Sequence, residues 1–186
     1  TVAGSIEAKD FAAGIFAASL PMKEEDETLS KLVNHAKVTA DGTAAGIVAQ
    51  TKEKVLLEDC VNTGVIEASV AAGITTAECE NLVLMRCQNY APIISSDNES
   101  YGITSNLTAN LTDCVGVSEN VYPIAADAKE SENCLYFISG GEKLEDALLA
   151  DICDISLTIG ETDATGSYRE YPFVEASEEQ LQNLIK

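Results

Sequence analysis

The stretch LLEDCVNTG at residues 56–64 recurs along the chain and decides its fold. Related segments follow as LVLMRCQNYA at 82–91 and NLTDCVGV at 110–117, and the three segments place cysteines 27 residues apart, at positions 60, 87 and 114. A self-similar period between about 20 and 50 residues is typical of solenoids, propellers and repeat arrays, where each unit buries its apolar face against its neighbours. The repeat therefore predicts a stacked architecture.

A glycine turn recurs between these segments. It reads AAGIFA, AAGIVA, AAGITT and SYGITS, and its glycines stand at positions 14, 46, 73 and 102. Short pieces directly after the cysteine segments, such as VIEASV from Val65 and PIIS from Pro92, are rich in β-branched residues and have the length usual for strands. The period thus has two parts, and it predicts an all-β fold of short stacked strands.

The aligned segments predict ladders of side chains that run from turn to turn. The first ladder contains Leu32, Cys60, Cys87 and Cys114, at separations of 28, 27 and 27 residues. The second ladder lies two residues further on and contains Asn34, Asn62 and Asn89, followed by Gly116. Because Asn tolerates left-handed backbone and its amide both donates and accepts, stacked Asn side chains can hydrogen-bond one another at a bend.

The cysteines of the ladder are interpreted as buried free thiols. Neighbouring strands lie within disulfide range, but side chains stacked in register point in parallel and suit the disulfide dihedral poorly. The sequence has no Cys-x-x-Cys pair, and its one histidine is His35, which we expect to be an exposed bend residue. It also lacks an EF-hand loop and the glycine-aspartate calcium nonapeptide. We therefore expect no metal site and no cofactor.

The net charge of the chain limits the classes of partner that it can bind. Thirty-one acidic against eleven basic residues give a formal net charge of −20. Binding to nucleic acid or to anionic lipid is carried largely by Lys and Arg, so both are excluded as expected partners. The sequence has no 18-residue apolar run, which argues against membrane insertion. The chain begins at Thr1 inside a repeat, and we interpret it as part of a larger polypeptide.

The repeat becomes irregular after Val117. We expect residues 1–140 to form about four to five solenoid turns and residues 141–186 to form an irregular strand and helix cap or the start of a following module. At the C-terminal end, Ser177 could cap a short helix whose apolar stripe contains Leu181, Leu184 and Ile185.

The Ala-Gly-Ile turn and the following D-C-x-N-T-G-x-I strand, clearest at residues 45–66, resemble the GLUG-type repeats of large secreted or wall-attached bacterial surface proteins. The resemblance covers about residues 1–140. It implies a right-handed parallel β-solenoid, located outside the bacterial cell. The family motif is a folding motif, and it assigns no active site to this sequence.

We therefore expect a non-enzymatic module of a cell-surface or secreted protein, which acts as an adhesive, ligand-binding face or as a rigid spacer. Its expected partner is a host glycan or an extracellular protein. Tyr90, Tyr101 and Tyr122 form a candidate ligand face along one edge, although tyrosines at solenoid corners also serve as packing residues.

The alternatives are a glycan-degrading β-helix enzyme, its carbohydrate-binding appendage, or the accessory stalk of a secreted peptidase. Glycan cleavage needs carboxylates or cations gathered on one face. Here the carboxylates of Glu58, Asp59, Asp113 and Glu119 occupy repeat positions, and the chain has two arginines, Arg86 and Arg169. A leucine-rich repeat is disfavoured because its consensus spacing is not met.

Overall fold

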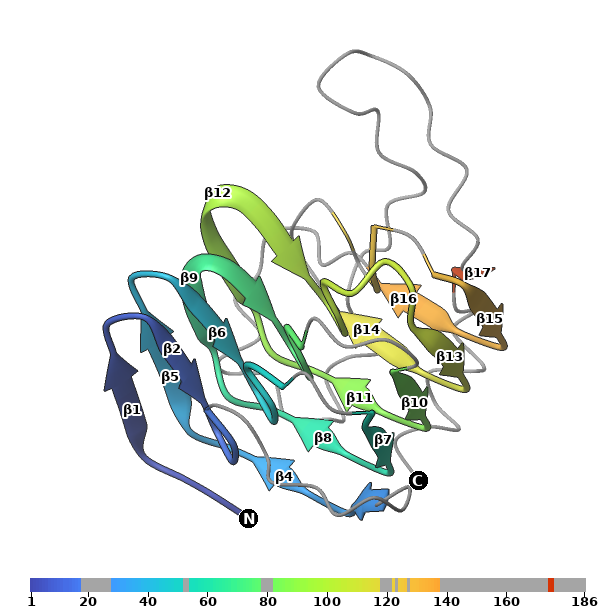
Figure 1. The fold of residues 1–186 in the computed structure, drawn as a ribbon, viewed down its shortest axis with the longest axis horizontal. Helices are drawn as coiled ribbons and strands as arrows, with labels where there is room; N and C mark the ends of the chain where they lie inside the picture. Colours follow the sequence, from blue (N-terminus) through green and yellow to red (C-terminus); the bar gives the residue numbers. More distant parts are fainter. Residues whose placement is uncertain are drawn as a thin grey trace.

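The computed structural model describes residues 1–17, 28–51, 54–77, 82–117, 122, 124–126, 128–137 and 174–175. Over these residues the secondary structure is all β, and the strands are parallel and stacked into a β-solenoid (Figure 1). The predicted fold class is confirmed. The helix predicted after Ser177 and nearly all of residues 141–186 lie outside the described residues.

Three parallel sheets run along the solenoid. Sheet 1 contains β1 (Ser5–Ala8), β2 (Phe11–Ala13), β5 (Lys37–Ala40), β6 (Thr43–Ala45), β9 (Ile66–Ala72) and β12 (Ile93–Tyr101). Sheet 2 contains β3 (Thr28–Ser30), β7 (Leu56–Glu58), β10 (Val83–Met85), β13 (Asn110–Thr112) and β15 (Glu130–Glu132). Sheet 3 contains β4 (Val33–Asn34), β8 (Val61–Asn62), β11 (Gln88–Asn89), β14 (Val115–Val117), β16 (Leu135–Phe137) and β17 (Val174–Glu175).

Each turn of the chain visits the three sheets in the same order. The regular part, measured from Leu32 to Cys114, comprises about three turns, where four to five were expected. Strands β1 and β2 before this part, and β15 and β16 after it, extend the sheets at both ends (Figure 1). The strict period is therefore confined to the centre of the solenoid.

The core lies inside the three sheets, and its residues come from repeat positions. Leu57 pairs in register with Leu84, and Leu84 with Leu111; all three are buried. The isoleucines of the glycine turns are buried in the same cluster, namely Ile47, Ile74 and Ile103. The Ala-Gly-Ile motif thus supplies an inward-facing side chain directly after each turn.

The corner between sheets 2 and 3 explains the Leu-x-x-Cys spacing. The residue before each position of the cysteine ladder has left-handed backbone, with φ of 52° at Asp59 and 50° at Arg86. This conformation interrupts the alternation of a strand, so Leu57 and Cys60 both face the core although three positions separate them. The Leu-x-x-Cys spacing therefore marks this corner of the solenoid.

The described ranges contain no helix with the length and apolar character needed to span a membrane.

Candidate functional site

The asparagine ladder occupies the inner side of sheet 3. Asn34 Nδ2 donates to Asn62 Oδ1 at 2.8 Å, and Asn62 Nδ2 donates to Asn89 Oδ1 at 2.7 Å. Each amide also closes a local turn, as where Asn34 Nδ2 donates to Ala36 O and Ala36 N donates to Asn34 Oδ1, both at 3.0 Å. All three Asn side chains are fully buried, and their mutual bonds satisfy polar atoms that burial would otherwise destabilise.

The ladder ends on residues that cannot continue it. Val2 pairs with Asn34 on one side, and Gly116 pairs with Asn89 on the other. Between these ends the three amides form a chain of hydrogen bonds in which each amide donates in the same direction, from Asn34 to Asn62 and from Asn62 to Asn89.

The glycine turns pack against this ladder. A β-carbon at Gly46 would lie 2.0 Å from Gly73 O and 2.7 Å from Asn62 Cγ. Gly14 and Gly73 have the same relation to Asn34 and Asn89. The two parts of the sequence repeat therefore meet in space, a contact that the sequence analysis did not identify.

The cysteine ladder is part of the core. Cys60, Cys87 and Cys114 are free and buried, Cys134 extends the series, and Leu32 packs against the same cluster half-buried. Cys87 Sγ donates to Leu57 O at 3.4 Å, and burial raises the pKa of the Cys87 thiol. In the part of the chain that the structure describes, no group of three or more His, Cys, Asp and Glu side chains could hold a metal ion.

Two of the acidic repeat positions, Glu58 and Asp59, form ion pairs with Arg86 on the corner. Arg86 Nε donates to Asp59 Oδ1 at 2.7 Å, and Arg86 Nη2 contacts Glu58 Oε1. The hydrogen bond from Arg86 holds the pKa of the Asp59 carboxyl below its usual value. His35 is exposed at its bend, as expected, with Nδ1 2.5 Å from Thr63 Oγ1. Glu119 lies outside the described residues.

Two of the three tyrosines of the candidate ligand face lie together, and the third lies elsewhere. Tyr101, at the end of β12, stacks on Tyr122 with ring centroids 5.0 Å apart and ring planes 8° apart. Tyr90 follows β11 at the corner between sheets 3 and 1, where its Oη donates to Gln88 Oε1 at 2.8 Å. Burial raises the pKa of Tyr90 to about 12. Tyr101 lines a cavity that Tyr90 does not reach.

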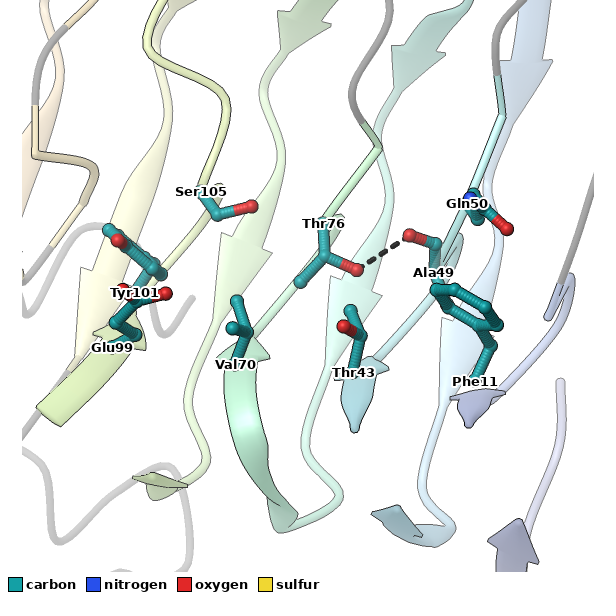
Figure 2. A pocket seen from close by; sticks show the side chains of 9 residues that line it. All are labelled: Phe11, Thr43, Ala49, Gln50, Val70, Thr76, Glu99, Tyr101 and Ser105. Carbon is teal, nitrogen blue, oxygen red and sulfur yellow. Dashed lines mark hydrogen bonds between the residues drawn. The ribbon is translucent and has the colours of Figure 1, made fainter. Parts of the chain in front are cut away.

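This cavity, which we name the axial groove, has a volume of about 370 Å³ and runs across successive turns (Figure 2). One wall is a register line along sheet 1, made of Phe11, Thr43, Val70 and Glu99. The opposite wall contains Ala49, Gln50, Thr76 and Ser105. Phe11 lies at one end of the groove and Tyr101 at the other (Figure 2).

The groove follows from the shape of the glycine turn. After each glycine the chain runs into a second line of parallel bridges, formed by Phe16, Val48, Thr75 and Thr104. Ala45 and Ala49 pack together across the bend with Ala13, so the two arms of the turn approach closely. Since the same bend repeats in each turn, the concave outer side of the corner becomes a continuous groove.

The described residues that line the groove are mostly uncharged polar and apolar. Glu99 is the one charged side chain among the described residues that line it. Thr76 Oγ1 donates to Ala49 O at 2.6 Å, whereas the side chains of Thr43, Gln50 and Ser105 make no hydrogen bond within the described part of the chain. Burial, with smaller effects from Glu99 and Tyr122, raises the pKa of Tyr101 to about 12, so its phenol stays protonated near neutral pH.

Comparison with known proteins finds no matching family model, no similar curated protein and no similar solved structure.

Proposed function

We propose that the chain is a non-enzymatic module of a bacterial cell-surface or secreted protein and that the axial groove is its ligand-binding face. The observation that carries this proposal is the register line from Phe11 to Glu99, which places one side chain from each of four successive sheet 1 strands along the groove. A rigid stack of turns presents such a line as an extended surface to a partner.

Ligand binding accounts for the groove better than a passive spacer does. A spacer needs the stacked core and the Asn ladder, but it needs no hollow on its outer side. The volume of about 370 Å³ falls within the range of about 300–1,000 Å³ usual for small-molecule sites. Within the described part of the chain the side chains of Thr43, Gln50 and Ser105 have no hydrogen-bond partner, so their polar groups are available to a ligand.

A glycan-degrading enzyme is the alternative in a different class. Most glycosidases use two carboxyl groups that flank the scissile bond, between about 5 and 9.5 Å apart. The described lining of the axial groove offers one carboxylate, that of Glu99. Asp59 and Glu58 are paired with Arg86 on a different corner. These observations favour binding over cleavage.

The extracellular location and the expected partner, a host glycan or an extracellular protein, belong to the same proposal. They rest on the resemblance of the repeat to GLUG-type sequences and on the net charge of −20, which disfavours nucleic acid. The accessory stalk of a secreted peptidase would have the same solenoid, but it would not require a ligand in the groove.

The test is a binding array of glycans and extracellular proteins, probed with the folded chain with and without calcium. The release of new reducing ends or unsaturated uronates is measured on the same spots. Saturable binding without product release is the expected result. Product release would overturn the non-enzymatic assignment, and an array without any hit would support a passive spacer.

A further inference from the structure

We infer that the axial groove binds a neutral oligosaccharide, whose pyranose rings lie along the solenoid between Phe11 and Tyr101. This inference rests on the proposed function and specifies the class of its ligand. It combines three features of the described lining residues: the aromatic residues at the two ends, polar side chains without a partner among these residues, and the absence of positive charge from them.

The two ends of the groove are aromatic. Phe11 is 39% exposed, whereas Tyr101 at the opposite end is only 8% exposed, and Tyr122 stacks on one face of its ring. Phe11 and Glu99 are three rungs apart along sheet 1, and at about 4.8 Å per rung this gives a length of about 14 Å. Pyranose rings present C–H faces that pack on aromatic side chains, so a short oligosaccharide suits a groove of this length with the exposed ring of Phe11 at one end and Tyr101 closing the other.

The walls between the aromatic ends carry hydrogen-bonding groups of both kinds. The hydroxyls of Thr43 and Ser105 both donate and accept, and the Gln50 amide does the same. None of the three has a side-chain partner within the described ranges. A ligand with many hydroxyls would pair with these groups, whereas a hydrocarbon or an aromatic side chain would desolvate them without replacing their bonds to water.

The charge of the groove selects against acidic sugars. Glu99 contributes a negative charge at the Tyr101 end, and no Lys, Arg or His is among the described lining residues. The whole chain carries a formal charge of −20. A uronate or sulfated glycan would be repelled, since sites for such anions need cations or a bound metal.

The experiment measures affinity for neutral oligosaccharides of glucose, galactose and mannose, and for oligogalacturonate, by isothermal titration calorimetry and by saturation-transfer NMR. Two variants test the groove. Phe11→Ala removes the exposed aromatic ring at one end, and Val70→Trp fills the middle. Ile94→Ala is the matched control, because Ile94 is an exposed apolar residue of sheet 1, 46% accessible, that does not line the groove.

We expect at least one neutral oligosaccharide to bind the wild type. Affinity should fall at least about tenfold in Phe11→Ala and be lost in Val70→Trp, while Ile94→Ala stays unchanged. Unchanged circular dichroism will show that each variant is folded. The inference is overturned if no neutral oligosaccharide binds, if oligogalacturonate binds more tightly, or if Val70→Trp binds like the wild type.

Failure of this inference is distinguishable from failure of the proposed function. If the array identifies a protein ligand whose binding Val70→Trp abolishes, the groove is the ligand face and only the sugar assignment is wrong. If no ligand of any class binds, both are wrong.

Discussion

Gly46 and Asn62 are in close contact inside the solenoid: a β-carbon on Gly46 would lie 2.7 Å from Asn62 Cγ. The glycine turn and the Asn ladder are therefore one structural unit, in which the missing side chain of one residue makes room for the amide of the other. The same pairing recurs at Gly14 with Asn34 and at Gly73 with Asn89.

Replacement of Gly46 by Ala should destabilise the fold by about 2–4 kcal/mol. The new methyl group would overlap the carbonyl oxygen of Gly73, at 2.0 Å, and backbone cannot move aside as a flexible side chain can. Urea unfolding followed by circular dichroism measures the effect. Ser5→Ala, on an exposed strand position, is the control and should change stability by less than about 0.5 kcal/mol. Equal stabilities for the two variants would contradict the close packing.

Replacement of Asn62 by Ala should cost about 2–4 kcal/mol. Asn62 is the middle of the ladder, so its loss removes the acceptor of Asn34 Nδ2 and the donor to Asn89 Oδ1, both buried. Thermal and urea unfolding measure the loss. Thr63→Ala changes the neighbouring exposed residue, and we expect a much smaller effect. If Asn62→Ala matched that control, the ladder would not stabilise the stack.

Replacement of Cys87 by Ser should lower stability by about 1–3 kcal/mol, because it places a more polar group in the apolar cluster. Cys87→Ala is the companion variant, since it leaves a small cavity but adds no polar group. Unfolding midpoints in denaturant measure both effects. A midpoint unchanged in Cys87→Ser would place the residue outside the core.

The Asp59 carboxyl should make folding sensitive to acid. Its folded-state pKa lies below the usual value of 3.8, chiefly because of the hydrogen bond from Arg86, so its contribution is present above the unfolded-state pKa. That contribution is lost as the pH falls through the lower folded-state pKa. Between about pH 6 and pH 2 the melting temperature should therefore decrease less steeply with falling pH in Asp59→Asn than in the wild type.

The variant Arg86→Gln checks the origin of this acid sensitivity. The hydrogen bond from Arg86 is the largest cause of the lowered Asp59 pKa, so its removal should weaken the decrease of melting temperature at acid pH in the same way. The double variant should show little further change. Additive effects of the two substitutions would show that Asp59 and Arg86 act independently.

The repeat positions allowed the fold and the two ladders to be predicted from sequence. A solenoid places residues that are one repeat apart next to one another on adjacent turns. The 27-residue spacing of Cys60, Cys87 and Cys114 therefore indicates that they are neighbours in space. The contact of Gly46 with Asn62 was missed because it joins two different phases of one turn. Its distance depends on how the chain bends between them, which the period does not specify.

The axial groove was also missed, for a chemical reason. Phe11, Thr43, Val70 and Glu99 share one phase but no side-chain type, so no motif marks them. The same phase comparison separates Tyr90 from Tyr101: Tyr90 follows the Asn ladder, whereas Tyr101 precedes a turn glycine. The sequence analysis grouped the tyrosines by residue type, and register would have been the better guide.

The asparagine ladder begins at Asn34 and ends at Asn89, with Val2 and Gly116 in register beyond its two ends, and this has a mechanical consequence. In a stack where each turn contacts only its neighbours, unravelling starts where the coupling between turns is weakest. The amide chain couples the turns that carry Asn34, Asn62 and Asn89. When the protein is pulled from its two ends, the outer turns should therefore peel away first and the central turns should yield last, at the highest force.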